Sequence, residues 1–315
     1  MNDAPPSDPT RCDDVCAVVV TYHPQLDVLR EVLSSVAQQV GRVVVFDNAT
    51  GGPAREAFAT FLAEAESQGF VVVRSATNVG LGAAMNRAAE QARAAGFAYL
   101  LLLDQDSLLD ADMVSTLRTA CVDLAATRPI AAVGPQFSDR RNGHIAPFIE
   151  IGFPLNRKLF GGPGQRVPCD FLISSGSLLP LDALAEVGGM DERLFIDNVD
   201  MEWCFRAQHR GFELFGICDA RMRHTIGDTL RAAWLKPGGM MIHKPIRLYY
   251  IMRNRVLLYG REETPAVWIA QDIPRLLLKF FGTALFVAPR WDYMRMMLRG
   301  LYDGVRGRSG PAAPR

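Results

Sequence analysis

Residues 99–106 read Tyr-Leu-Leu-Leu-Leu-Asp-Gln-Asp, an apolar run that ends abruptly in two acids. An unbroken apolar run is typical of a strand buried on both faces of a sheet, and we expect this strand over residues 98–103. Residues two apart in an extended strand point to the same side, so Asp104 and Asp106 should face one way. The pattern beyond them predicts a helix over residues 111–127.

Three further strand-and-helix pairs precede this strand. The strands are predicted over 15–21, 42–47 and 70–74, and the helices over 25–39, 53–68 and 80–95. Strand and helix therefore alternate up to residue 127. This alternation predicts an α/β fold of Rossmann-like type, with a mostly parallel sheet and helices on both faces.

The rest of the chain is less regular. Residues 130–164 are rich in Gly, Pro and Arg, and we expect them to be irregular. Strands are predicted over 171–179 and 213–218, helices over 182–187 and 198–210, and a C-terminal helical region over 244–303. The chain should thus form one catalytic domain over 15–243 followed by helices, with disordered ends at 1–14 and 304–315.

Composition excludes several classes of protein. The 315 residues are 49% hydrophobic and 22% charged, which is ordinary globular usage, and the net charge of zero gives no support to nucleic-acid binding. The six cysteines contain no Cys-x-x-Cys pair, which favours reduced thiols in a cytosol. Residues 1–10 are polar and Pro-rich without an apolar segment, so the sequence predicts a cytoplasmic protein.

Charge and aromatic residues set the C-terminal third apart. Residues 221–315 hold 17 Lys and Arg against 6 Asp and Glu, whereas residues 1–220 hold 17 against 28. Aromatic and basic side chains interleave over 268–299, which fits a helix lying in the interface of an anionic membrane. The alternative is helices that pack on the catalytic domain with solvated charges. The apolar stretch 276–289 is too short to span a bilayer.

Several polar residues follow predicted strands and should meet at one edge of the sheet. They are Thr21, Asp47, the loop 78–82 and the Asp104/Asp106 pair. Two acids on one face suit a divalent cation shared with a diphosphate; solvated acids at a helix start are the alternative. The glycines of the loop 78–82 let backbone approach a ligand, unless the loop is a plain strand-to-helix turn.

A second acidic segment begins a predicted helix. Asp197, Asp200 and Glu202 lie beside apolar Phe195 and Trp203. Partial burial would raise a carboxyl pKa toward that of a useful base, although acids also suit a first helical turn because of the helix dipole. His224, which follows the last predicted strand, is a candidate third metal ligand or a structural histidine.

Taken in order, these motifs resemble the inverting glycosyltransferases of family 2, which have a GT-A fold. The resemblance covers residues 16–227, with a weaker match over 249–254. The motifs that carry it are Val20-Thr21-Tyr22, Asp47-Asn48, Asn78-Val79-Gly80 with Asn86, Asp104-Gln105-Asp106, Ser175-Gly176, the acidic helix and the late His224. More narrowly, residues 103–107, 171–176 and 194–202 resemble bacterial rhamnosyltransferases, above all those of rhamnolipid biosynthesis.

The resemblance implies a role for each matching residue. The nucleotide-sugar donor would be bound by Thr21, Asp47, Asn78, Gly80, Asn86 and Asp104. A divalent metal, Mg²⁺ or Mn²⁺, would be held by Asp106, Asp104 and His224. The acceptor would be bound by Ser175, Gly176, Glu202, Trp203 and Arg253. Asp200 would be the catalytic base, with Asp197 in reserve because Val199 stands where the family has a glutamate.

The resemblance also implies a reaction. Residues 15–127 would bind dTDP-L-rhamnose and residues 128–243 an amphiphilic glycolipid acceptor, with mono-rhamnolipid the first choice and an O-antigen or other polysaccharide the second. The helices 244–303 would contact the cytoplasmic face of the inner membrane peripherally. A nucleotidyltransferase is a distant alternative, because Thr21-Tyr22-His23-Pro24 replaces the Gly-rich basic loop that such enzymes carry after the first strand.

Overall fold

The computed structural model describes residues 11–224, 229–233 and 236–313. The elements of the first half are β1 (Cys12–Thr21), α1 (Leu26–Ala37), β2 (Val40–Asp47), α2 (Arg55–Ser67), β3 (Val71–Arg74), α3 (Leu81–Ala94), β4 (Tyr99–Asp104), β5 (Leu108–Leu109), α4 (Met113–Ala125) and β6 (Ile130–Asp139). Those of the second half are β7 (Phe148–Glu150), β8 (Arg157–Leu159), β9 (Arg166–Pro168), β10 (Leu178–Pro180), α5 (Leu181–Val187), α6 (Val199–His209), β11 (Glu213–His224), β12 (Thr229–Ala233), β13 (Lys236–Ile242), α7 (Pro245–Tyr259), α8 (Ala266–Phe286) and α9 (Arg290–Val305).

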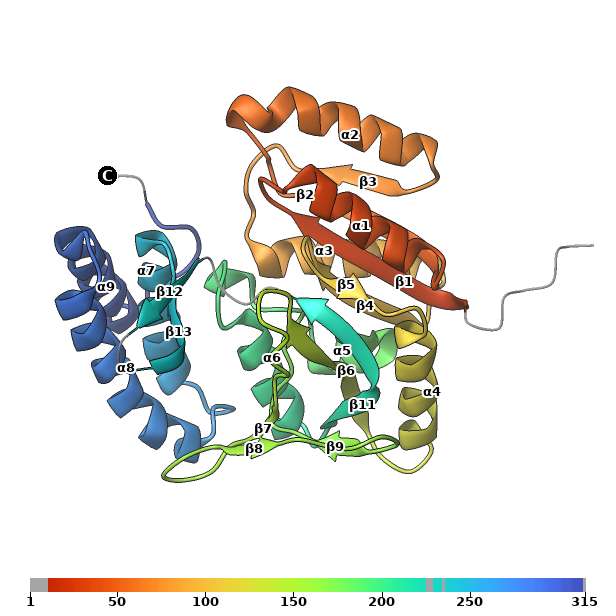
Figure 1. Cartoon of the computed structure of the whole chain (residues 1–315). Coiled ribbons are helices and arrows are strands. Elements are labelled where there is room, and N and C mark those ends of the chain that lie inside the picture. The colour runs from red at the N-terminus through yellow and green to blue at the C-terminus, as the bar shows by residue number, and fades with distance from the viewer. Residues whose placement is uncertain (1–10, 225–228, 234–235, 314–315) are drawn as a thin grey trace, which may run out of the picture.

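A single mixed sheet organises the molecule, with strand order β3-β2-β1-β4-β10-β6-β11-β5 and β9 beside β11 (Figure 1). β3, β2, β1 and β4 are parallel, as the alternating pattern predicts. β10 runs antiparallel between β4 and β6, and β6 and β11 are parallel to each other. In this register Thr21 pairs with Asp47 and Val20 with Asp104, so three predicted site residues meet at one sheet edge.

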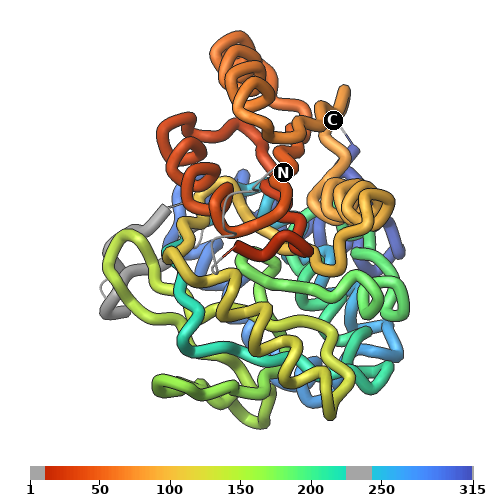
Figure 2. The backbone as a smooth tube through the Cα atoms, turned by 90° about the vertical axis from the view of Figure 1, so that its right-hand side faces the viewer, coloured from red at the N-terminus to blue at the C-terminus, as the bar shows by residue number. Residues whose placement is uncertain are grey.

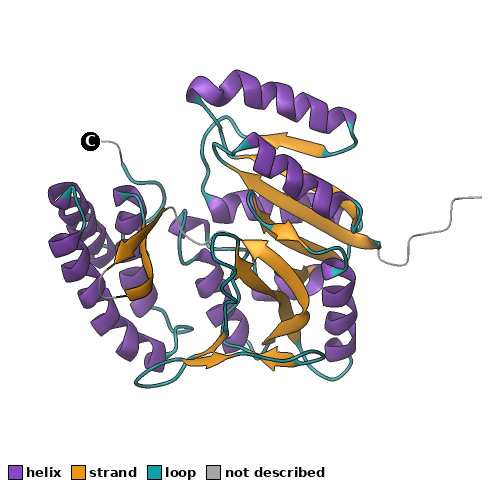
Figure 3. Ribbon diagram, viewed as in Figure 1, coloured by secondary structure: helices purple, strands orange, loops and turns teal. Residues whose placement is uncertain are grey.

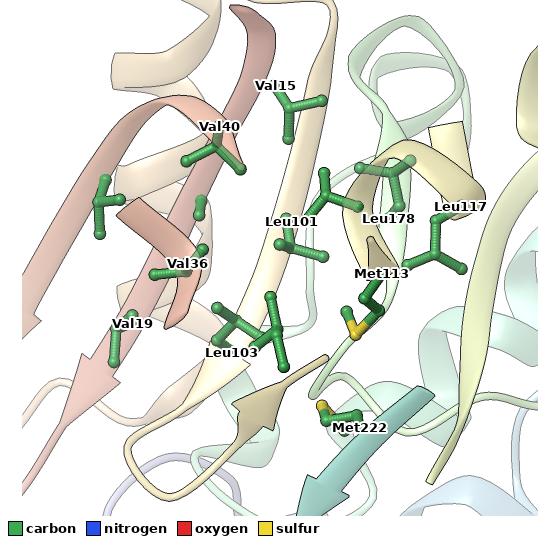
Figure 4. Close-up of a cluster of buried hydrophobic side chains, with 14 of the residues drawn as sticks. Val15, Val19, Val36, Val40, Leu101, Leu103, Met113, Leu117, Leu178 and Met222 are labelled. Carbon is green, nitrogen blue, oxygen red and sulfur yellow. The ribbon is translucent and has the colours of Figure 1, made fainter. Parts of the chain in front are cut away.

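Helices cover both faces of the sheet, which confirms the predicted fold class (Figure 3). Alternate residues of β1 point to opposite sides, since Val19 belongs to a core cluster that includes residues of α1, α2 and α4, whereas Val18 belongs to one that includes residues of α3, α5 and α6. The first of these clusters includes Val36 of α1 and Leu101 of β4 (Figure 4). Burying each such side chain contributes about 1.5–3 kcal/mol, which fixes the sheet edge in place.

The C-terminal helices form a unit beside the sheet. α7, α8 and α9 pack together through a cluster that includes Met252, Leu276 and Met297 (Figure 1). Gly300 of α9 lies so close to α7 that an added Cβ would stand 2.3 Å from the Tyr249 carbonyl oxygen. In the part of the chain that the structure describes, no helix has both the length and the apolarity that a membrane crossing requires.

The structure corrects the prediction between residues 130 and 179. Residues 130–139, expected to be irregular, form the central strand β6. The Gly134-Pro135 pair of this strand is a composition typical of irregular structure; in the fold a Cβ on Gly134 would stand 2.8 Å from the Leu172 side chain, which would have to shift. Of the strand predicted over 171–179, only Leu178–Leu179 lies in β10; the positive φ of Gly176 turns the chain just before it.

The ends of the chain also differ from the prediction. Residues 11–14 are described, and β1 begins at Cys12, whereas residues 1–10 lie outside the described part. α9 extends to Val305, and the segment after it is hydrogen-bonded to the rest of the chain as far as Ala312. In the view turned by 90°, the first part of the chain lies above the yellow and green middle part (Figure 2).

Candidate functional site

Two acids and a histidine lie where β4 and β11 end. Asp104 is the last residue of β4, Asp106 follows in the turn before β5, and His224 is the last residue of β11. One ligand atom from each residue lies within 4.8 Å of the others. His224 Nδ1 is 3.3 Å from Asp106 Oδ1, and His224 Nε2 is 3.8 Å from Asp104 Oδ2. The sequence-predicted metal ligands are therefore brought together.

Two serines orient this cluster. The Ser107 and Ser175 hydroxyls are hydrogen-bonded to each other, and the Ser107 hydroxyl is 3.0 Å from His224 Nδ1. The Ser175 hydroxyl accepts a hydrogen bond of 3.1 Å from the Asp104 backbone N–H. Ser107 and Ser175 are both buried. Ser175, predicted to bind the acceptor, thus supports the acidic pair, and Ser107 is a site residue that the sequence analysis missed.

The electrostatics of the cluster suit a cation. Burial raises the pKa of Asp104, and the nearby charge of Asp106 raises it further. Burial lowers the pKa of His224, but its hydrogen bond with Asp106 and the charges of both acids outweigh this and raise it. Two carboxylates and an imidazole that face one another match the donor set of a divalent metal. The residues present therefore fit a divalent cation with open positions for a ligand.

The first two strands contribute the polar side chains on one flank. The Thr21 hydroxyl donates to the Phe46 carbonyl oxygen at 3.2 Å, and Asp47 Oδ1 accepts from the Thr50 N–H at 2.9 Å. The Gln105 side chain accepts from the Tyr22 N–H at 2.8 Å, which ties the ends of β1 and β4 together. These bonds fix the loops after β1, β2 and β4 at the predicted crevice.

The loop before α3 contacts the acidic segment. Asn78 Oδ1 accepts from the Gly80 N–H at 3.0 Å, and Gly80 has a φ of +87°. A Cβ on Gly80 would stand 2.6 Å from the Phe195 carbonyl oxygen, so glycine is required for close approach. Asn86 lies farther along α3 and is bonded to the Met190 backbone at 2.7 and 2.9 Å. The structure thus places Asn86 at the junction of α3 with the segment before residue 193.

Asp200 faces the cluster of Asp104, Asp106 and His224 from the other side. Its Oδ1 accepts from the Met201 N–H at 2.8 Å, and its Oδ2 accepts from the Ser174 N–H at 3.4 Å. Because Ser175, the next residue, is bonded to Asp104, the two acids flank one short segment of chain. Burial raises the pKa of Asp200 to about 6, and the charges of Asp104 and Asp197 add to the effect. A carboxyl group with this pKa is a suitable general base.

Asp197 has a different environment. It forms an ion pair with Arg247 of α7, at 2.5 Å between Oδ1 and Nη2. The positive charge of Arg247 also lowers the pKa of Asp104, although burial outweighs this and raises it overall. The Asp197 carboxylate is therefore already engaged by a cation, whereas the hydrogen bonds that Asp200 accepts in the described part of the chain come from backbone N–H groups. Arg247 carries no motif, and only the packing of α7 against the acidic segment reveals it.

Four residues predicted to bind the acceptor have structural partners instead. Glu202 is buried and pairs with Arg206 and Arg261, each at 2.9 Å. The indole N–H of buried Trp203 donates to the Gly188 carbonyl oxygen at 2.9 Å. The remaining two are Gly176, where a Cβ would stand 2.6 Å from Pro135, and Arg253, which is fully buried and bonded to backbone carbonyl oxygens. The resemblance implied acceptor binding for these residues, whereas the contacts that the structure gives them are with the protein itself.

Comparisons with known proteins agree with this geometry. The sequence model of Glycosyl transferase family 2 matches residues 16–174. The dTDP-rhamnosyl transferase RfbF of Shigella flexneri is 30% identical over 302 residues, which cover 94% of this chain and 97% of that protein.

Solved structures of low sequence identity share the fold. The crystal structure of GalNAc-T7 with UDP, GalNAc and Mn²⁺ has a TM-score of 0.61 at 13% identity, covering 96% of this chain and 59% of that chain. The mannosyltransferase PcManGT from Pyrobaculum calidifontis, in complex with GDP-Man and Mn²⁺, has a TM-score of 0.54 at 15% identity, covering 96% and 90%. These likenesses confirm the predicted GT-A fold.

Proposed function

Because the chain belongs to glycosyl transferase family 2, we propose that it is an inverting rhamnosyltransferase that moves L-rhamnose from dTDP-L-rhamnose to an amphiphilic glycolipid. The observation that carries the choice of donor is the similarity to a dTDP-rhamnosyl transferase along nearly the full length of both chains. The acid cluster opposite Asp200 supports a transfer reaction at the sheet edge.

The donor lies at the carboxyl ends of the parallel strands in this proposal. Thr21 and Asp47 line the nucleoside side, and the turn at Asn78 and Gly80 brings backbone close to the ligand. Asp104, Asp106 and His224 would hold Mg²⁺ or Mn²⁺. That cation would supply positive charge against the nucleoside diphosphate as it leaves.

Asp200 performs the proton transfer. Its carboxylate accepts the proton of the acceptor hydroxyl while the oxygen forms a bond to the anomeric carbon of rhamnose. The bond from that carbon to the diphosphate breaks, and dTDP leaves with the electron pair. Attack from the face opposite the leaving group inverts the anomeric centre. Asp197 remains paired with Arg247 and helps to hold the positive side chain beside the site.

The C-terminal helices support an acceptor that is embedded in a membrane. α8 exposes Ile273, Leu277, Phe281 and Leu285, spaced four residues apart and therefore on one face. Leu278 and Phe286 on α8, together with Trp291 in the first turn of α9, are 73–79% exposed. We define these seven side chains as the α8 face.

Charge complementarity selects the occupant of the α8 face. Arg290 and Arg295 beside it are exposed, and the C-terminal third carries the excess of cations. An apolar face rimmed by arginines fits an anionic phospholipid bilayer, into which the apolar side chains insert while the cations stay at the headgroups. The enzyme then works at the cytoplasmic face of the membrane, where it meets a lipid-anchored acceptor such as mono-rhamnolipid or, as the second choice, a lipid-linked O-antigen glycan.

A donor panel tests the reaction. The purified protein is incubated with Mg²⁺ and dTDP-L-rhamnose, UDP-glucose, UDP-GlcNAc or GDP-mannose, with mono-rhamnolipid or a lipid-linked glycan, and products are identified by mass spectrometry. We expect the acceptor to gain the mass of one deoxyhexose with dTDP-L-rhamnose and with none of the other donors. NMR of the product should show an α-linkage. Preferential transfer from a UDP-sugar would contradict the donor assignment, and the Asp200→Asn variant serves as the inactive control.

Vesicle sedimentation tests the membrane contact. We expect the protein to pellet with vesicles of anionic phospholipid at low salt, and the triple variant Leu278→Ser, Phe286→Ser, Trp291→Ser to stay in the supernatant. Val122→Ser replaces an exposed apolar side chain on another helix, α4, and as the control it should pellet like wild type. If the triple variant pelleted as much as wild type, a bilayer would be refuted as the occupant. The same holds if wild type formed concentration-dependent dimers without lipid and the triple variant did not.

A further inference from the structure

The loop that leads into Asp200 has an unfavourable backbone. We define loop 193–198 as the last two residues of the short 3-10 turn Glu192–Leu194 together with the four residues that lead from it to α6. Phe195, Asp197 and Asn198 have φ values of +66°, +63° and +63°. None of them is glycine, and each such conformation costs about 1 kcal/mol or more. Contacts from outside the loop must therefore hold it in this shape.

Asn254 of α7 supplies the main contacts. Its side chain is fully buried, and its Nδ2 lies 3.0, 2.8 and 2.8 Å from the carbonyl oxygens of Leu194, Ile196 and Asp197, so that its two N–H groups are shared among three acceptors. One amide thus bridges the backbone on both sides of the strained turn. Removing it would leave three carbonyl groups of the loop without this donor in a buried place.

Arg253 reinforces the same loop and connects it to the C-terminal segment. Its guanidinium donates to the Leu194 carbonyl oxygen at 2.9 Å and to the Gly310 carbonyl oxygen, while its Nε donates to Asn254 Oδ1 at 3.0 Å. The Gly310 N–H donates to the Arg193 carbonyl oxygen at 2.6 Å. Residue 310 therefore closes a ring of hydrogen bonds around the start of the loop.

Aromatic contacts complete the arrangement. The Phe195 ring stacks on Tyr250 of α7 with centroids 5.2 Å apart, and the Arg253 guanidinium lies 4.9 Å from the centroid of Tyr250. The Tyr250 hydroxyl accepts from the Ala312 N–H at 2.8 Å. On its other side, the Phe195 carbonyl oxygen accepts from the Leu81 N–H at 2.6 Å. The loop is thus held between α7, the C-terminal segment and the start of α3.

We propose that Asn254, Arg253 and residues 310–312 form a clamp that positions loop 193–198, and through it the Asp200 carboxylate, for the chemical step. Asn254 and Arg253 are positioning residues, because the contacts described above are to backbone of the loop and not to reacting atoms. The proposal rests on the proposed function in one respect, namely that Asp200 accepts the proton. It is independent of the identity of the sugar and the acceptor.

Kinetics of a matched pair of variants test the clamp. Asn254→Asp keeps the side-chain size but replaces the donating amide with an oxygen, and Asn142→Asp makes the same change in an exposed turn where the asparagine uses its oxygen. We expect Asn254→Asp to lower kcat about tenfold to a hundredfold while the Kd for dTDP changes less than about threefold, because displacement of the base affects the chemical step alone. Asn142→Asp should match wild type in both.

Truncation isolates the contribution of the C-terminal segment. A chain that ends at residue 309 loses the Gly310 and Ala312 contacts but keeps all of α9, whereas a chain that ends at residue 313 keeps both contacts. We expect the shorter chain to lose about tenfold in kcat and the longer one to match the full-length protein. An unchanged kcat of the shorter chain would show that the C-terminal segment is not part of the clamp.

Hydrogen exchange separates failure of the clamp from failure of the proposed function. In Asn254→Asp, amide exchange should become faster in a peptide covering 193–198 while peptides from β1 and β4 stay protected. If wild type transfers no sugar from any donor, the proposed function is wrong, and the exchange pattern still decides the clamp. Unchanged exchange in this peptide, or faster exchange throughout the protein, would overturn the clamp, as would parallel losses in kcat and dTDP affinity.

Discussion

The two acidic parts of the site are positioned in different ways. Thr21, Asp47 and Asp104 lie at the ends of adjacent parallel strands, whose backbone hydrogen bonds fix their register. Loop 193–198 and Asp200 lie outside the sheet, and the loop is held by side chains of α7 that are 57–60 residues away in sequence. The positions of the residues in one half of the site therefore depend on backbone pairing, whereas those in the other half depend on a few buried side chains.

The largest expected effect comes from a change in the half of the site that lies at the sheet edge. Asp106→Asn removes a charge from the Asp104, Asp106 and His224 cluster. We expect kcat/KM to fall about a thousandfold, because a bound cation stabilises leaving-group charge by several kcal/mol. Initial rates measure this, and EDTA should abolish wild-type activity until Mg²⁺ or Mn²⁺ is restored. Asp112→Asn, a change at an exposed acid nearby, is the control; activity that resists EDTA would contradict a metal site.

An effect of comparable size tests the half of the site that lies on the loop and α6. Asp200→Asn should lower kcat about 10²–10⁴-fold with dTDP affinity largely intact, because the amide cannot accept the proton. Asp197→Asn, which breaks an ion pair with Arg247, should lose less. Single-turnover rates compare the two variants. The reverse order of losses would transfer the base role to Asp197.

The pH dependence sharpens the difference between the halves. Asp200 must be ionised to accept a proton, and its pKa is raised to about 6, so kcat should fall as pH falls through about 6. The fold favours the protonated form. Protonated Asp200 therefore contributes stability that is fully present below pH 3.8, the pKa of the group in the unfolded chain, and that is lost as pH rises through about 6.

At pH 8, Asp200→Asn should therefore be more stable than wild type by about 1–3 kcal/mol in the free energy of unfolding, and it should melt at a higher temperature. The difference should vanish near pH 4. Melting temperatures across this range measure the effect. Equal stability of the two proteins at pH 8 would show that the environment of Asp200 does not disfavour its charge.

The smallest effect on turnover concerns Glu202, which the sequence suggested as an acceptor-binding residue. Its carboxylate is buried between Arg206 and Arg261. Glu202→Gln should lower the free energy of unfolding by about 3 kcal/mol, because both arginines lose a charged partner, while the acceptor KM stays unchanged. Denaturant unfolding and acceptor titration measure the two quantities. A raised acceptor KM with unchanged stability would show that Glu202 binds the acceptor.

The strength of the sequence prediction varied along the chain. In the first 127 residues, apolar runs and their endings predicted the parallel strands and the meeting of Thr21, Asp47 and Asp104, because a parallel ladder aligns strand ends whatever the side chains do. The Asp104 and Asp106 pair was visible in the same way. In contrast, the Gly, Pro and Arg content of residues 130–164 made the buried strand β6 look irregular, because composition alone does not distinguish glycine and proline in a packed strand from the same residues in a turn.

By itself, the sequence determined the α/β class, the sheet edge that carries the polar residues and the acids that could act there, because these follow from local periodicity. Only the tertiary structure decided that Asp200 faces the Asp104 cluster, that Asp197 is paired with Arg247, and that Arg253 is buried behind the loop. These facts depend on how α7 packs against a loop far away in the chain. No local pattern records such a contact, because its energy comes from residues that become neighbours only on folding.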